Sequence, residues 1–319
     1  MNLRGIDYFV FVASGTLNFF GDGWRFHKFY RQIFRKGFDF GGATFVSKTT
    51  TLNERKGNME LDNNLQPCSL FPDCVRVYPV KGVVLNSVGL SGPGANHLFS
   101  QGFWQKSREP FFISFMSVEA TKEQRIEEAK IFARIFAREL PSFSTRVGLE
   151  LNISCPNTAH CSLSLIDDAV DQLQPFSGLD IPKIIKVNAL TPIEAIVRIA
   201  ASGLCDAILV SNTIPWGQLP DKIDWRKIFG STVSPLRHLG GGGLSGYPLL
   251  PIIGNWIFEA KEKGVSVPII GGGGILRASD VDYLHANGAD AVSIGTVAII
   301  RPWRVKGIIE RARQLYGGE

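Results

Sequence analysis

Short runs of apolar residues alternate along the chain with longer stretches in which apolar residues recur every three or four positions. The short runs are rich in Val, Ile, Leu and Phe and have the length of buried β-strands. We place eight strands in this way, near residues 8, 43, 111, 147, 184, 207, 267 and 291. Most of the stretches between them have the period of amphipathic helices. Strands that alternate with helices indicate a parallel sheet that is buried on both faces.

Local signals mark where several of these helices begin. Thr121 and Gln124 have the spacing of a capping box and precede apolar residues on one helical face. We expect Thr191 to cap a second helix, with Pro192 at its first position, and Ser279 to cap a third. Eight strands separated by helices are typical of a (β/α)8 TIM barrel. A doubly wound sheet is the alternative, but no Gly-x-Gly-x-x-Gly sequence follows the first strand.

One segment, residues 52–109, breaks the alternation. It is rich in Asn, Pro and Gly, with a short apolar run at 83–85 and room for one short helix at 97–106. A connection of this length inside a compact domain usually serves as a lid or substrate loop. We therefore predict a single domain, residues 1–319, in which this excursion follows the second strand and passes over the C-terminal mouth of the barrel.

Composition narrows the class of protein. Apolar residues make up 45% and charged residues 20% of the chain, which supports a large core. The net charge of +5 is scattered, so we predict no nucleic-acid partner, although a phosphate-bearing ligand is compatible with it. The odd count of five cysteines, without a Cys-x-x-Cys pair, argues against a metal site and for a reducing compartment. No apolar run has transmembrane or signal-peptide length, so we expect a cytoplasmic protein that does not bind membranes.

The strand near residue 147 is followed by chemically versatile side chains. Asn152, Cys155 and Asn157 lie within six residues, just beyond the apolar run. Carboxamides donate and accept hydrogen bonds together, which suits a planar ligand rich in amides. A thiol titrates near enough to neutral pH to act as an acid or base. The alternative for Cys155 is a small buried side chain, as free cysteines often are.

Glycines gather after the last three strands, in residues 240–246, residues 271–274 and the pair Gly295-Thr296. Backbone N–H groups in such loops bind anions, and barrels commonly hold phosphate after strands seven and eight. Tight turns would explain any one cluster, but three on one face favour a phosphate site. Lys48 and Lys186 end strands on the same face. Each alone resembles a solvated surface residue, whereas an anionic cofactor there would make both of them contacts.

Together these motifs resemble the dihydroorotate dehydrogenases, flavin-dependent barrels of pyrimidine synthesis. The resemblance runs nearly end to end, and its most specific part is the Asn-Ile-Ser-Cys-Pro-Asn run from Asn152 to Asn157. The other segments that carry it are Ala13-Ser14-Gly15, Ser47-Lys48-Thr49, Asn86-Ser87-Val88-Gly89-Leu90, Lys186, Ser211-Asn212-Thr213, Gly242-Gly243-Leu244-Ser245-Gly246, Gly271 to Ile275 and Ile294-Gly295-Thr296.

The resemblance implies FMN as the cofactor. The residues that it implies as cofactor contacts are Ala13, Ser14, Gly15, Lys48, Thr49, Asn86, Asn152, Lys186, Ser245, Gly246, Gly273, Gly274, Gly295 and Thr296. The phosphate would lie on the last four of these, assisted by Ser245 and Gly246. Lys48 and Lys186 would face the isoalloxazine, where a cation stabilises the negative charge of the reduced ring.

The resemblance also implies dihydroorotate as the substrate and orotate as the product. The residues that it implies as substrate contacts are Lys48, Asn86, Val88, Gly89, Leu90, Asn152, Asn157, Asn212 and Thr213. Cys155 would be the base that removes a proton from C5 while hydride passes from C6 to flavin N5. The soluble branch of the family has Cys at this position and the membrane-associated branch has Ser. Homodimers are common in the soluble branch.

The chain departs from the family pattern at several positions. Residues 158–164 lack the Gly and Pro pattern of the fumarate-using enzymes, and Met59 stands where Pro is usual. The electron acceptor is therefore open among fumarate, a quinone, and NAD reached through an iron–sulfur subunit. Two alternative functions are a dihydropyrimidine dehydrogenase-like flavin subunit acting on uracil or thymine, and a flavin- or phosphate-binding barrel without catalysis. The first of these needs no residue for a carboxylate, so four Asn side chains and Lys48 exceed its requirements.

Overall fold

Eight parallel strands form a closed barrel in the computed structural model, which describes residues 1–154, 168–210 and 212–318. The barrel strands are β3 (Val10–Val12), β4 (Thr44–Phe45), β7 (Phe111–Phe115), β8 (Val147–Asn152), β9 (Lys183–Val187), β10 (Ala207–Val210), β13 (Ile269–Gly272) and β14 (Ala291–Ile294). They pair in the order β4-β3-β14-β13-β10-β9-β8-β7. Parallel bridges from Val46 to Phe112 and from Thr50 to Phe115 join the two ends of the sheet. The predicted TIM barrel is confirmed.

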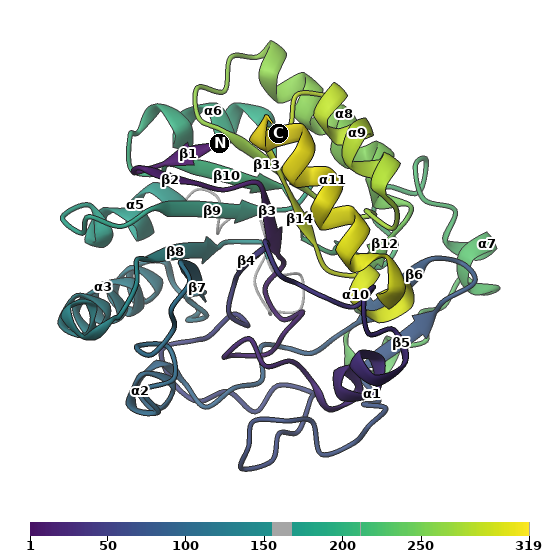
Figure 1. Ribbon diagram of the computed structural model, residues 1–319, viewed down its shortest axis with the longest axis horizontal. Coiled ribbons are helices and arrows are strands. Elements are labelled where there is room, and N and C mark those ends of the chain that lie inside the picture. The colour runs from purple at the N-terminus through teal and green to yellow at the C-terminus, as the bar shows by residue number, and fades with distance from the viewer. Residues whose placement is uncertain (155–167, 211, 319) are drawn as a thin grey trace.

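Helices follow most of the barrel strands and lie outside them, as Figure 1 shows for α3, α8, α9 and α11. The α-helices are α1 (Arg25–Ile33), α2 (Ala95–Ser100), α3 (Lys122–Glu139), α5 (Ala169–Leu173), α6 (Ile193–Ala201), α7 (Trp225–Phe229), α8 (Leu249–Glu262), α9 (Ala278–Ala286), α10 (Val297–Ile300) and α11 (Val305–Gly317). The 3-10 helices are η1 (Leu140–Ser142), η2 (Gln174–Phe176), η3 (Arg237–Leu239) and η4 (Pro302–Arg304).

The barrel interior is apolar near the N-terminal ends of the strands and polar near their C-terminal ends. Phe11, Phe112 and Leu209 pack in one buried cluster near the N-terminal ends of the strands. Gly148 makes room for this packing, because a Cβ atom there would lie 2.3 Å from the ring of Phe112. A short hairpin of β1 (Asn2–Leu3) and β2 (Ile6–Asp7) packs against the same cluster. Ligands therefore have access to the interior from the C-terminal ends.

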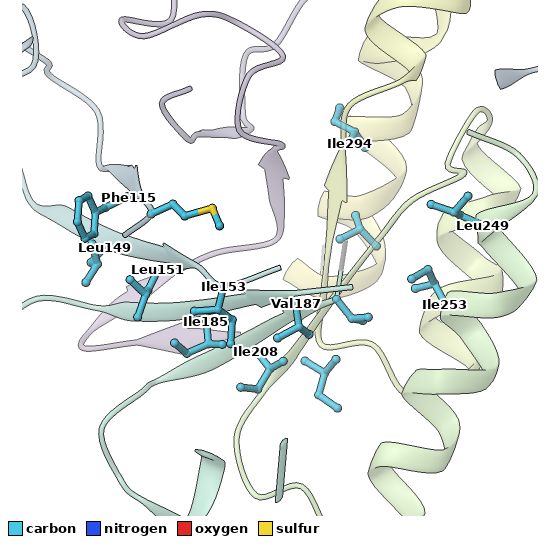
Figure 2. Packing of buried hydrophobic residues seen from close by; sticks show 14 of the residues in the cluster. Phe115, Leu149, Leu151, Ile153, Ile185, Val187, Ile208, Leu249, Ile253 and Ile294 are labelled. Atoms are coloured by element: carbon cyan, nitrogen blue, oxygen red, sulfur yellow. The ribbon is translucent and has the colours of Figure 1, made fainter. Parts of the chain in front are cut away.

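A second apolar layer joins the strands to the surrounding helices. Figure 2 shows Leu249 and Ile253 on one face of α8, directed toward the strands that carry Val187 and Ile294. The ring of Phe115 stacks on Phe132 of α3, with 3.9 Å between the centroids. Burial of this layer fixes the helices to the sheet, so the strand ends form a rigid platform.

Residues 52–109 hold more regular structure than the sequence suggested. They contain β5 (Val75–Tyr78) and β6 (Val83–Asn86), which pair with β12 (Gly243–Gly246) and β11 (Ile214–Pro215) in an antiparallel sheet ordered β11-β12-β6-β5. Strands from two distant parts of the chain thus share this small sheet (Figure 1). The predicted short helix is α2, which begins and ends earlier than residues 97–106.

Three further expectations concern where elements begin. Thr121 caps α3, since its hydroxyl accepts from the Gln124 N–H at 3.2 Å, as predicted. Thr191 does not cap α6: Pro192 is the N-cap, and the Thr191 hydroxyl is buried without a hydrogen-bond partner among the described residues. Ser279 does not cap α9, because the helix begins at Ala278 and already includes Ser279. The Asp280 carboxylate accepts a hydrogen bond from the Leu276 N–H at this end of the helix.

The second predicted strand is also shorter than expected, since β4 covers Thr44–Phe45 alone. Beyond it the chain keeps contact with β7 through single bonds, such as Ser47 N–H to the Phe112 carbonyl at 2.9 Å. Within the described residues, the helices are all too short or too polar to cross a bilayer.

Candidate active site

Polar side chains from five strands converge where the C-terminal ends of the barrel strands meet. Ser14 follows β3, Lys48 and Thr49 follow β4, Asn152 ends β8, and Lys186 is the penultimate residue of β9. Asn212 and Thr213 follow β10. The sequence placed all of these at strand ends, and the barrel brings them to one rim. They form the candidate site.

Five side chains make a closed ring of polar contacts inside the rim, which we call the polar ring. Lys186 Nζ donates to Ser14 Oγ at 2.7 Å, and Ser14 Oγ lies 3.2 Å from Thr49 Oγ1. Thr49 Oγ1 lies 2.8 Å from Ser114 Oγ, which donates to Glu150 Oε1 at 2.7 Å. Glu150 Oε1 is 3.5 Å from Lys186 Nζ and closes the ring. Both charged side chains are almost fully buried, Glu150 at 1% and Lys186 at 4% exposure.

Two carboxamides extend from the polar ring. Asn152 Nδ2 donates to Thr49 Oγ1 at 3.3 Å. Asn212 Nδ2 donates to Asn152 Oδ1 at 3.1 Å and to Ser154 Oγ at 3.2 Å. Ser154 in turn donates to the Lys186 carbonyl at 3.3 Å. The carboxamides are held by side chains on neighbouring strands, which is the preorganisation that a specific binding site requires.

Lys48 connects the barrel to the excursion. Its ammonium donates to the Ser91 carbonyl at 2.5 Å and lies 4.9 Å from the centre of the Phe19 ring. The side chain is buried, so this cation lies in an environment where its field is weakly screened. A lone lysine at a strand end would be solvated, and the excursion is what excludes water here.

The excursion covers the rim with a tight turn at Val88, Gly89 and Leu90. Gly89 and Leu90 have φ angles of 72° and 60°, in the left-handed region. Arg55 Nε donates to the Gly89 carbonyl at 2.9 Å, which stabilises the turn. Asn86 ends β6 directly before it, at the edge of the small sheet nearest the turn. The predicted substrate contacts in this segment therefore lie together.

The predicted phosphate turn follows β13. Gly273 and Gly274 have φ angles of 101° and 83°. A Cβ atom on Gly274 would lie 2.6 Å from the Leu250 backbone N, in the first turn of α8. Across the rim, a Cβ atom on Gly295 would lie 3.2 Å from Ala13 Cβ, and Thr296 precedes α10. The lack of side chains brings the backbone of this turn against the first turn of the long helix α8, and a glycine turn beside a helix start is an arrangement that suits an anion.

The glycine stretch 240–246 differs from its predicted role as a loop. Gly243–Gly246 is strand β12 of the small sheet, and Ser245 Oγ donates to the Val84 carbonyl at 3.3 Å. A Cβ atom on Gly246 would lie 2.2 Å from the Gly82 carbonyl O. Close approach of β6 therefore explains Gly246. Its own carbonyl lies beside Gly274, so the end of β12 reaches the phosphate turn.

Cys155 and Asn157 lie outside the described residues. Of the cysteines described, Cys68 is exposed, while Cys74 and Cys205 are buried. Burial raises the pKa of the Cys74 thiol, and it raises the pKa of Cys205 to about 12. Both buried thiols are thus held in the neutral, unreactive form. Among the described residues, no cluster of His, Cys, Asp and Glu could hold a metal ion.

Sequence reasoning missed Glu150 and Ser114. The strand near residue 147 was interpreted as an apolar run, in which Glu150 is a single charged exception. Alternation along β8 places Gly148, Glu150 and Asn152 on the inward face. A charge two positions before the predicted carboxamide, on the same face, was the available signal.

Comparisons with known proteins agree on one family. Residues 26–315 match the sequence profile described as Dihydroorotate dehydrogenase. The chain is 30% identical to a protein of Lactobacillus helveticus named dihydroorotate dehydrogenase A (fumarate), over 97% of this chain and 91% of that protein. It is 29% identical to one of Anoxybacillus flavithermus named dihydroorotate dehydrogenase B (NAD(+)), catalytic subunit, over 94% and 84%. A crystal structure of DHODH from Eimeria tenella in complex with ferulenol has the same fold, with a TM-score of 0.65, 18% identity and coverage of 99% of this chain and 84% of that one.

Proposed function

The chain belongs to the dihydroorotate dehydrogenase family, a family of oxidoreductases, and on this basis we propose that it oxidises dihydroorotate to orotate with bound FMN. The observation that carries the proposal is the convergence of two buried lysines and two carboxamides on the rim of the barrel, next to a glycine turn. This combination suits an anionic, planar cofactor and a ligand with ring amides and a carboxylate.

The residues at the rim fit FMN. Its phosphate would bind the turn at Gly273 and Gly274 together with Gly295 and Thr296, where backbone N–H groups and the start of α8 favour an anion. When bound, the flavin supplies a hydride acceptor. Lys186 would hold a positive charge under its ring, which favours the anionic reduced form. Of the other proposed cofactor contacts, Ala13, Ser14 and Gly15 would border this position, since Ser14 Oγ accepts a hydrogen bond from Lys186 Nζ.

The substrate would bind between Lys186, on the barrel side, and the excursion, on the opposite side. Asn152, Asn212 and Thr213 offer hydrogen bonds from the barrel side, and Asn86 with the turn at residues 88–90 offers them from the excursion side. Thr213 supports this proposal, because its hydroxyl is buried and has no hydrogen-bond partner among the described residues. Lys48 would pair with the substrate carboxylate.

Cys155 would be the base, with Asn157 as a further substrate contact. Its thiolate would take the proton from C5 as the C6–H electron pair leaves as hydride, so that a C5–C6 double bond forms. The described backbone on its N-terminal side supports the role, since Asn152 and Ser154 are held in the site by Asn212.

A reduction assay tests the proposal. The purified protein is expected to be yellow, to contain FMN and to lose its absorbance when dihydroorotate is added without oxygen. Bleaching by dihydrouracil instead would favour a dihydropyrimidine dehydrogenase-like activity. A yellow protein that neither compound bleaches would be a flavin-binding barrel without this activity.

The oxidant and the assembly form the second part of the proposal. The relatives include proteins named for fumarate and others named as NAD-dependent catalytic subunits, so reoxidation is tested with fumarate, a quinone, and NAD with an iron–sulfur partner.

We expect a cytoplasmic homodimer. The unpaired Cys68, Cys74 and Cys205 support a reducing location.

A further inference from the structure

The polar ring has a feature that its separate contacts do not reveal: the direction of its hydrogen bonds is determined. A carboxylate only accepts hydrogen bonds and an ammonium only donates them. Glu150 and Lys186 are neighbours in the ring, and three hydroxyls connect them the long way round. Each hydroxyl has a single proton to donate. The two charged residues therefore fix the orientation of every hydroxyl between them.

The direction can be followed from Glu150. Ser114 must donate to the carboxylate at 2.7 Å, so its oxygen accepts from Thr49 at 2.8 Å. Thr49 has then used its proton and accepts from Ser14 at 3.2 Å. Ser14 in turn accepts from the Lys186 ammonium at 2.7 Å. The donors thus run in one direction, from the cation through three hydroxyls to the anion.

This direction requires the same orientation of the Asn152 carboxamide as two backbone N–H groups do. Ser154 N–H donates to Asn152 Oδ1 at 3.4 Å, and Thr213 N–H donates to Asn212 Oδ1 at 2.9 Å, which turns the Asn212 NH2 group toward Asn152. Because the Thr49 proton is committed to Ser114, Thr49 can only accept from Asn152, and the contact at 3.3 Å must come from the Asn152 NH2 group. The carbonyl of Asn152 then faces Asn212 and accepts from its NH2 group at 3.1 Å. Within the part of the chain that the structure describes, the second N–H of Asn152 makes no hydrogen bond. Together with Lys186, it gives this side of the rim the character of a hydrogen-bond donor.

We propose that Glu150 and Ser114 are positioning residues that set the direction of the polar ring, keep Thr49 an acceptor for Asn152 and so hold the Asn152 NH2 group in place as a donor toward the ligand. The proposal rests on the proposed function, since it treats Asn152 as a substrate contact. Its chemical consequence is a preference for a carbonyl or carboxylate oxygen at this point of the ligand. Without Glu150 or Ser114 the Thr49 proton is released and can face the Asn152 NH2 group, so that the carboxamide loses the acceptor that holds this end of it in place.

The first test compares two buried serines of the same segment. Ser114→Ala breaks the path from Glu150 to Thr49. Ser117→Ala is the matched control, because Ser117 is equally buried and its hydroxyl has no partner among the described residues. Orotate affinity is measured on the FMN-loaded proteins by the shift in flavin absorbance.

Ser114→Ala is expected to weaken orotate binding by roughly 5- to 150-fold, the usual effect of one mispaired buried hydrogen bond. It should raise KM for dihydroorotate more than it lowers kcat and leave FMN content unchanged, and Ser117→Ala should do none of these. Equal orotate affinity in the two variants would overturn the proposal. A wild-type protein without FMN or without any response to orotate would instead overturn the proposed function.

A second test uses the chain without FMN and therefore does not depend on activity. Glu150→Gln and Lys186→Met should each lower the melting temperature, because each leaves its partner as a buried uncompensated charge. The double variant should lose less than the sum of the two single losses. Additive losses would show that Glu150 does not compensate Lys186, and would overturn its role as the anionic end of the ring.

Discussion

Cys155 is the residue on which the proposed chemistry depends. Removing a general base usually lowers a rate by about 10²- to 10⁴-fold. Cys155→Ala should therefore lose dihydroorotate oxidation to that extent and retain its FMN, because the phosphate turn is on other strands. Cys155→Ser should retain a little activity that rises with pH. Flavin bleaching under single-turnover conditions measures both rates.

The exposed Cys68 provides the control for that experiment. Cys68→Ala should bleach at the wild-type rate. A Cys155→Ala protein that does the same would show that the base is another group.

His27 makes stability depend on pH. The imidazole is buried between Phe26 and Phe38, and burial, with Arg31 nearby, lowers its pKa to about 3 from an ordinary value of 6.5. Below pH 6.5 the unfolded chain therefore takes up a proton that the folded chain does not. The free energy of unfolding should fall by about 1.4 kcal/mol per pH unit from this residue between pH 6.5 and about 3, and be unaffected by it above pH 6.5.

His27→Asn retains an acceptor for the Trp24 N–H, which His27 Nδ1 accepts at 3.2 Å, but does not titrate in this range. Denaturant unfolding at pH 7 and pH 5 should show a smaller loss in the variant than in the wild type. Parallel losses in the two proteins would contradict the lowered pKa.

At this scale, residue types that carry their chemistry at a strand end could be predicted. Lys48, Asn152 and Lys186 were predicted because a polar residue at the end of an apolar run can be recognised in the sequence alone. Glu150 and Ser114 lie inside strands, and their partners come from other strands. Their role exists only once the barrel has closed: the spacing of Glu150 from Asn152 could have shown that they share a face, but it could not have identified Ser114 and Lys186 as the partners of Glu150.

The turn between β13 and α9 is the element that the phosphate proposal depends on. Gly274→Ala would place a Cβ atom 2.6 Å from the Leu250 N, at the start of α8. Gly240→Ala is the matched control: its φ of 79° is similar to the 83° of Gly274, but a Cβ atom there meets nothing within 4 Å. Both changes carry the left-handed strain of roughly 1–2 kcal/mol. Gly274→Ala alone should yield colourless protein, as measured by FMN per chain after release by heat.

The excursion gives a prediction for the opposite side of the site. Asn86→Ala should weaken orotate binding by roughly 5- to 150-fold without loss of FMN, since it removes one proposed hydrogen bond to the ligand in a dry site. Asn63→Ala, in an exposed part of the same excursion, should have no effect. Orotate titration of the two variants decides whether the excursion contributes to binding.

Elements with a strong local signal were predicted well, and those that depend on distant partners were not. The capping box of α3 is local, and the structure confirms it. The small sheet pairs β6 with β12, which are far apart in the chain, and short strands rich in glycine have little periodicity of their own. The stretch 240–246 was therefore interpreted as a loop. In the case of Thr191, proline geometry at Pro192 moved the helix start by one residue.

For the whole molecule, the alternation of strands and helices was sufficient to predict the barrel. Closure itself is not encoded in any single strand: β4 and β7 meet through isolated bridges rather than a full ladder. The apolar cluster at the lower end of the barrel explains how this remains stable, because the interdigitated rings of Tyr8, Phe11 and Phe112 hold the strands from within. A core of this kind depends on how the volumes of the side chains fit together, which is difficult to predict from the spacing of apolar residues in the sequence.

The indole of Trp24 donates to the Gly15 carbonyl at 2.9 Å, and Gly15 belongs to the segment proposed to border the flavin. Tryptophan emits light at wavelengths that oxidised flavin absorbs, and the transfer of excitation weakens steeply with distance. The chain has six tryptophans, of which Trp24 is tied by this bond to the proposed cofactor segment. Loading with FMN should therefore quench its emission strongly, and bleaching the flavin should restore part of it. The protein thus contains its own optical reporter of cofactor occupancy, which can be observed without any added dye.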